Sequence, residues 1–139
     1  MTLPDLLAGC ERRPGAEERA IVALERALGT SIPIDFRTLL RESDGLEGFV
    51  VADEYIALWS VDDIRQLNAA YSIRQFLPGV VLIGTNGADR GYGFTTGAGA
   101  VEYVSVPLVG MGPDQVRRLG KTFEGLLDQI RAEGRLDSN

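Results

Sequence analysis

Short strand-like runs separated by brief turns place the strongest constraint on the fold. Three such runs lie at 80–83, 91–96 and 101–109, with the turn signals Asn86-Gly87 and Thr96-Gly97-Ala98-Gly99 between them. Parallel neighbours require a crossover of about a dozen residues or more, whereas antiparallel strands need only a tight turn. The pattern therefore predicts an antiparallel meander, in which Pro107 marks a sheet edge or the end of the third strand.

Helical periodicity flanks this meander. Apolar residues recur at three- and four-residue intervals in four segments, at 16–28, 33–42, 61–71 and 122–132. Gly29 is placed to cap the first helix, Pro33 suits the first turn of the second, and Ser60 is a candidate N-cap of the third. Two further strands are predicted at 49–51 and 55–59. The order of the elements predicts an α+β fold, with an antiparallel-rich twisted sheet and helices packed on one face.

The chain contains 139 residues, which is enough for one hydrophobic core, and it shows neither an internal repeat nor a linker. We expect a single domain over residues 16–132. Residues 1–15 are predicted to be an irregular segment, and residues 133–139 a polar tail that Gly134 releases from the last helix.

The charge and the missing histidine exclude several classes of function. The sequence has 14 Lys and Arg against 20 Asp and Glu, a formal net charge of −6, and no histidine. Without histidine there is no Ser-His-Asp or Cys-His catalysis and no His-containing zinc site. Nucleic-acid affinity depends mainly on clustered Lys and Arg, so the net charge argues against nucleic-acid binding and favours a basic partner or simple solubility.

The sequence predicts a cytoplasmic protein. No stretch is apolar over the roughly 20 residues that a membrane span needs, and the first residues lack the basic start of a signal peptide. The single cysteine, Cys10, cannot form an internal disulfide, which fits a reducing compartment. Cys10 also has no histidine base beside it, so a nucleophilic role is not expected.

Acidic residues concentrate around the first predicted hairpin and the start of the third helix. We interpret them as a surface complementary to a basic partner, with the only tryptophan as an additional anchor. The alternative is that the acids stabilise a helix start and solvate turns, and that the tryptophan packs in the core. The candidate partner-binding residues are Asp44, Glu47, Asp53, Glu54, Trp59, Asp62 and Asp63.

No other pattern indicates catalysis, a cofactor or a metal. Adjacent carboxylates on a strand point to opposite faces, so sequence adjacency does not support a paired-acid active site. A hard-cation loop with alternating oxygen ligands is also absent. The Gly-rich segment 84–93 leads into a strand-like run and contains no lysine, which favours turns over a phosphate-binding loop.

Five segments, spanning about Ala16 to Ile130, form a recognisable series. They are Leu24-Glu25 to Leu28-Gly29, then Ile32-Pro33-Ile34-Asp35-Phe36-Arg37 through Ser43-Asp44-Gly45, Leu58-Trp59, Ile83-Gly84 through Gly91-Tyr92-Gly93-Phe94, and Thr122-Phe123-Glu124-Gly125-Leu126-Leu127. In sequence and in order these segments resemble the SUKH superfamily, whose best-known eukaryotic members are the yeast Smi/Knr-type regulators of cell-wall assembly. The closing segment departs from the family pattern at Gly125, where a larger residue is usual.

The resemblance implies a non-catalytic protein-binding domain that needs no cofactor or metal. Bacterial members act as immunity proteins that bind and block a cognate toxin, which implies the same role here. A basic, nuclease-like toxin domain is then the expected partner of the acidic surface. The eukaryotic members imply an alternative, an intracellular regulatory or scaffold module that binds endogenous proteins.

Overall fold

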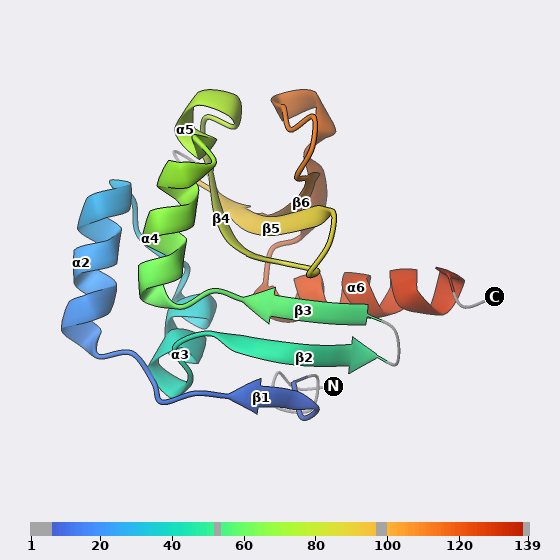
Figure 1. Ribbon diagram of the computed structural model, residues 1–139, viewed down its shortest axis with the longest axis horizontal. Helices are drawn as coiled ribbons and strands as arrows, with labels where there is room; N and C mark the ends of the chain where they lie inside the picture. The colour runs from blue at the N-terminus through green and yellow to red at the C-terminus, as the bar shows by residue number, and fades with distance from the viewer. Residues whose placement is uncertain (1–6, 52–53, 97–99, 138–139) are drawn as a thin grey trace.

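Pairs of helices and runs of two or three strands follow one another along the chain. The computed structural model of the protein describes residues 7–51, 54–96 and 100–137 (Figure 1). Among these residues the helices are α2 (Glu18–Leu28), α3 (Ile34–Glu42), α4 (Val61–Ala70), α5 (Ile73–Phe76) and α6 (Phe123–Asp137), with a 3-10 turn η1 at Pro113–Gln115. The strands are β1 (Cys10–Arg12), β2 (Leu46–Val51), β3 (Glu54–Leu58), β4 (Val80–Thr85), β5 (Arg90–Thr95), β6 (Tyr103–Pro107) and β7 (Arg117–Gly120).

The described strands form one antiparallel sheet in which sequence order and spatial order are the same. Its order is β1-β2-β3-β4-β5-β6-β7, and every neighbouring pair is antiparallel. This confirms the meander predicted from the short turns and the α+β fold class. Pro107 is the last residue of β6, as one of the two expected placements has it; β6 is not an edge strand, because β7 pairs with Tyr103–Ser105 on its other side.

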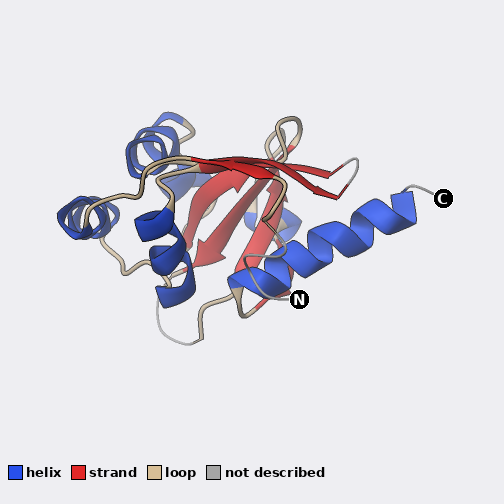
Figure 2. Ribbon diagram, turned by 90° about the horizontal axis from the view of Figure 1, so that it is seen from below, coloured by secondary structure: helices blue, strands red, loops and turns tan. Residues whose placement is uncertain are grey.

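A sharp corner divides the sheet into two parts. β3 and β4 pair only through Ala57 with Thr85 and Leu58 with Gly84, so β1–β3 and β4–β7 are oriented differently (Figure 2). A Cβ atom on Gly84 would lie 2.4 Å from the backbone oxygen of Ala57. Only glycine permits the two strands to approach this closely.

The two parts of the sheet also differ in how they are covered. β4, β5 and β6 each contain four consecutive buried residues, so both of their faces are covered. Burial alternates toward the end of β3, where Ile56 and Leu58 are buried and Tyr55 and Ala57 are partly exposed. The part of the sheet formed by β1–β3 therefore has one packed face and one face open to solvent.

Helices cover the packed faces and build one core. α6 packs on β2, β3, β6 and β7, α4 and α5 pack on β4, and α2 packs on α3 and α4. Figure 2 shows α6 on one side of the β1–β3 part of the sheet. The buried side chains that these helices contribute include Ile21, Leu24, Phe36, Leu39, Leu40, Ile64, Ile73, Phe123, Leu126, Leu127 and Ile130.

The half-buried carboxylate of Asp35 joins three segments at the edge of this core. It accepts hydrogen bonds from the hydroxyl of Tyr103 at 2.5 Å and from the backbone N–H of Phe123 at 2.7 Å. The ring of Phe123 packs against Phe36, with a centroid distance of 5.5 Å, and against Tyr103 at 5.7 Å. Burial, and then the hydrogen bond to Asp35, raise the pKa of Tyr103 far above its ordinary value, so the phenol remains a donor.

The predicted helix ends agree with the structure at most positions. Gly29 caps α2 in the left-handed conformation at φ 72°, Pro33 precedes α3, and the Ser60 hydroxyl caps α4 by accepting from the N–H of Asp63. The sequence did not predict α5, η1 or β7. Each of these contains four residues or fewer, too few to show a period.

Both ends of the chain differ from expectation. Cys10–Arg12, in the segment predicted to be irregular, form β1 by pairing with β2. The last helix was expected to end at Ala132, but α6 continues to Asp137. Glycine in a helix costs about 1 kcal/mol relative to alanine, yet it keeps its backbone N–H, so Gly134 weakens the helix without ending it.

Replacing Asp35 tests the junction of α3, β6 and α6. Asp35→Ala leaves a buried phenol and a helix N-terminal N–H without an acceptor, so we expect the free energy of unfolding to fall by about 3 kcal/mol. The measurement is urea unfolding followed by the fluorescence of Trp59. Asp128→Ala removes only an exposed carboxylate 3.9 Å from Arg131 and should change the same quantity by less than about 0.5 kcal/mol. Equal losses in the two variants would contradict this role for Asp35.

Replacing Gly84 tests the corner of the sheet. Gly84→Ala forces a methyl group against the Ala57 backbone, and we expect the free energy of unfolding to fall by about 2 kcal/mol or more. The matched control is Gly112→Ala, where φ is −166° and the nearest atom is the end of the Asp114 side chain. The control should stay within about 0.5 kcal/mol of the parent protein in the same unfolding experiment. A tolerated Gly84→Ala would show that the corner does not require glycine.

Candidate functional site

Three of the predicted contact residues gather at the N-terminus of α4. Oδ1 of Asp44 accepts a hydrogen bond from the N–H of Val61 at 2.8 Å, and Asp62 and Asp63 occupy the first turn of the helix. Carboxylates at this position stabilise the helix because they face the positive end of its dipole. Asp44 thus has a structural role, whereas the side chain of Asp62 is 78% exposed.

Glu47 lies on the solvent-facing side of β2. One carboxylate oxygen accepts a hydrogen bond from the hydroxyl of Tyr55 at 2.6 Å, and the other lies 3.7 Å from the guanidinium of Arg13. The hydrogen bond to Glu47 raises the pKa of Tyr55, which keeps the phenol protonated. Glu47 pairs with Ala57 on one side and with Glu11 of β1 on the other.

Glu54 lies apart from this group. It is the first residue of β3. Ala57, the residue that pairs with Glu47, lies three residues further along the strand, which corresponds to about 10 Å. Glu54 neighbours Tyr55 in sequence, and successive strand residues point to opposite faces, so Glu54 and Tyr55 face opposite sides of the sheet. Asp53 lies outside the described residues.

Trp59 is a core residue. It is 9% exposed and belongs to the hydrophobic cluster beneath α3 and β2. Its role as a surface anchor is therefore wrong, because contact with a partner would require the core to open. The alternative interpretation, core packing at the end of the strand, is the one that the structure supports.

The structure therefore brings four predicted residues to one junction, where β2 begins and where β3 leads into α4 (Figure 1). We call Asp44, Glu47, Asp62 and Asp63 the acidic junction. Two arginines lie beside it: Arg13 near Glu47, and Arg65 at 3.7 Å from Asp62. Both ion pairs are solvent-exposed, and such pairs hold their side chains weakly. The junction retains an excess of negative charge.

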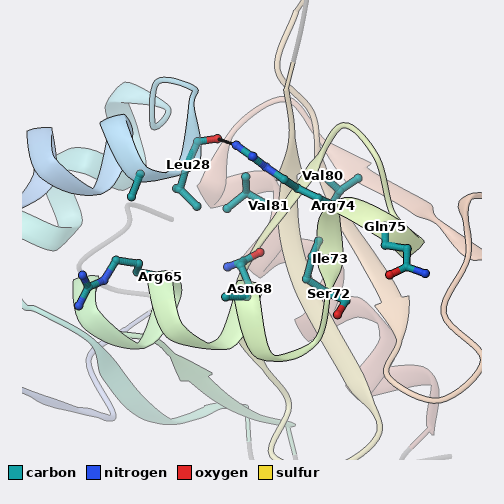
Figure 3. Close-up of a pocket in the computed structure, with 11 residues that line it drawn as sticks. Leu28, Arg65, Asn68, Ser72, Ile73, Arg74, Gln75, Val80 and Val81 are labelled. Atoms are coloured by element: carbon teal, nitrogen blue, oxygen red, sulfur yellow. Dashed lines mark hydrogen bonds between the residues drawn. The ribbon is translucent and has the colours of Figure 1, made fainter.

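A cavity of about 380 Å³ lies between the end of α2, the second half of α4, α5 and the start of β4 (Figure 3). Asn68 spans it, donating to the carbonyls of Ile64 and Leu82 and accepting from the N–H of Leu82. Arg74 donates to the carbonyl of Leu28 at 2.8 Å and so caps α2. These polar groups bind the protein's own backbone, so they serve the fold. This cavity could not be predicted from the sequence, because its lining comes from four separate elements; an asparagine in the apolar pattern of a helix is the one local signal.

Neither a metal nor a membrane site is evident among the described residues. Within them, no group of three or more Cys, Asp or Glu side chains is arranged to hold a metal ion. In that same part of the chain, no helix is long and apolar enough to cross a membrane. Burial raises the pKa of the Cys10 thiol, which lowers its thiolate fraction and its reactivity.

Comparison with known proteins gives a match over most of the chain. The model of the SMI1 / KNR4 family (SUKH-1) matches residues 15–129. This range begins just before α2 and ends within α6, so it contains the acidic junction and the corner of the sheet. A search of curated proteins found no match.

Proposed function

Because the chain belongs to the SMI1 / KNR4 family (SUKH-1), we propose that it is an immunity protein that binds and neutralises a cognate bacterial toxin. The family match is the observation that carries this proposal. Membership supports a non-catalytic immunity or regulatory domain that acts through protein–protein contacts. We assign the function to residues 16–132. Occluding the active or substrate-binding face of the toxin is sufficient for neutralisation.

The acidic junction is the surface proposed to contact the toxin. Of its members, Glu47 and Asp62 keep 42% and 78% of their side chains exposed, so their carboxylates can reach a partner. Asp44 contributes charge while it holds the start of α4. With a net charge of −6, the protein attracts a basic partner over long range, and carboxylates at the contact surface then fix the orientation of the complex. A basic, nuclease-like toxin domain fits this charge.

The family takes its name from SMI1 and KNR4, and the resemblance to Smi/Knr-type regulators favours a second candidate function. In that case the same surface binds an endogenous basic protein. The two functions differ in the gene neighbourhood: an immunity gene lies beside the gene of its toxin, whereas a regulator needs no such neighbour.

Co-expression with the toxin of the adjacent gene tests the proposal. The parent protein should restore growth and co-purify with the toxin. Removing three carboxylates in Glu47→Gln/Asp62→Asn/Asp63→Asn should weaken binding about tenfold or more, because long-range attraction and contact pairs are lost together. The measurement is the dissociation constant by titration calorimetry, with the thermal midpoint of each variant as a check on folding.

The matched control carries the same change in charge elsewhere: Glu17→Gln/Asp114→Asn/Asp128→Asn. These three residues are exposed and lie outside the acidic junction, so binding should weaken less than about threefold. If the parent protein gives neither complex nor rescue, the immunity function is wrong. If the complex forms and the two triple variants bind alike, the acidic junction is not the contact surface.

A further inference from the structure

The solvent-facing side of β1–β3 carries an aromatic pair beside two carboxylates. In the register of the strands, Glu11 lies opposite Glu47, and Phe49 lies opposite Tyr55. We call these four residues the outer face. α6 packs on β2 and β3 from the other side, and in Figure 1 no described helix lies in front of these two strands.

The residues of the outer face lower the stability of the sheet, so stability alone does not explain their presence there. Phe49 is 54% exposed, although phenylalanine gains free energy from burial. Glu11 and Glu47 are like charges directly opposite each other on neighbouring strands, an arrangement that destabilises a sheet. Arg13 is the cation beside Glu47, and it offsets one of the two carboxylates. The outer face thus exposes apolar area and an excess negative charge together.

Internal contacts hold the aromatic pair in place. The rings of Phe49 and Tyr55 meet edge to face, with centroids 5.3 Å apart and an interplanar angle of 69°. The hydroxyl of Tyr55 is anchored on Glu47, which fixes the carboxylate beside the rings. A Cβ atom on Gly87 would lie 3.0 Å from the Tyr55 ring, so the β4–β5 turn supports that ring closely. The site is therefore arranged before any partner arrives, which lowers the cost of binding.

An arginine side chain fits this combination of groups. Its planar guanidinium stacks on aromatic rings and also pairs with carboxylates, whereas lysine offers only a compact, strongly hydrated charge. Aromatic anchors next to charged groups are typical of the residues that dominate binding energy in interfaces. We propose that the outer face receives an arginine of the toxin, with the guanidinium on the Phe49 and Tyr55 rings and paired with Glu47 and Glu11. This inference rests on the proposed function, because it takes the toxin to be basic.

A second exposed apolar patch provides a comparison. Tyr71 and Phe76 line a cavity of about 240 Å³ together with Leu108, Gly110 and Met111. Phe76 is 49% exposed, close to the value for Phe49, but none of the residues lining this cavity is charged. The patch therefore offers apolar area without the carboxylates that would select a cation.

Phe49→Ala and Phe76→Ala form a matched pair of variants for the complex with the toxin of the adjacent gene. We expect Phe49→Ala to raise the dissociation constant about tenfold or more, and Phe76→Ala to raise it less than about threefold. Both residues are half exposed, so neither change should prevent folding; thermal midpoints check this. If the complex forms and Phe49→Ala binds like the parent protein, or if Phe76→Ala is the weaker binder, the inference fails while the immunity function stands.

A second experiment uses peptides and needs no toxin. Isotope-labelled protein is titrated with acetyl-Gly-Arg-Gly-amide and, separately, with acetyl-Gly-Lys-Gly-amide, and amide and aromatic chemical shifts are recorded. Saturable shifts of Phe49 and Tyr55 that are stronger for the arginine peptide, and that are lost in Glu11→Gln/Glu47→Gln, are expected. Equal responses to the two peptides, or shifts confined to other parts of the chain, would overturn the assignment of an arginine site.

Discussion

The carboxylate of Asp35 is the interaction on which the arrangement of the rest of the structure depends. Its two partners, Tyr103 and Phe123, lie 68 and 88 residues further along the chain. By accepting from the first N–H of α6, Asp35 holds the start of that helix against α3, and α6 in turn packs on both parts of the sheet. A single side chain at the start of α3 thereby links the helical N-terminal half to the end of the meander. The bonded phenol stays neutral because burial and Asp35 both raise the pKa of Tyr103.

A similar contact joins α2 and α3. Glu25 accepts from the N–H of Ile32 at 2.8 Å and pairs with Arg37 at 2.9 Å. Glu25, Asp35 and Arg37 all belong to the segments that carry the family resemblance. Their contacts show that these segments build the fold, whereas the proposed binding surfaces lie at the acidic junction and on the outer face. Family membership therefore accounts for the framework, and we propose that exposed side chains of the two surfaces select the partner.

The elements that could be predicted from the sequence are those whose position is determined by interactions within the segment itself. α2, α3 and α4 could be placed because capping residues and apolar periodicity lie within each segment, and the meander followed from turn lengths. β1 and β7 could not be predicted, because each exists only through pairing with a distant strand. The acidic junction was anticipated by proximity in sequence, but Trp59 was assigned to a surface that it does not reach. Phe49 was not predicted to be a contact residue. Side chains alternate between the two faces of β2, so the burial of Leu46 places Glu47 and Phe49 together on the opposite, exposed face.

The corner at Gly84 determines which face of β1–β3 is open to solvent. It turns β1–β3 away from β4–β7, so that α6 covers one face of β1–β3 and leaves the outer face available beside the start of α4. The acidic junction and the outer face share Glu47, which makes them neighbouring parts of one negatively charged surface. We propose that recognition begins with electrostatic attraction to this surface and is completed by the aromatic contact.

The salt dependence of association tests this account most directly. The association rate constant of the protein with the toxin of the adjacent gene is measured by stopped-flow fluorescence at ionic strengths from about 0.02 M to about 0.5 M, over which screening lengths shorten several-fold. We expect this rate constant to fall steeply with added salt, by about tenfold or more, because attraction between opposite charges accelerates the encounter. An association rate that does not change with salt would contradict it.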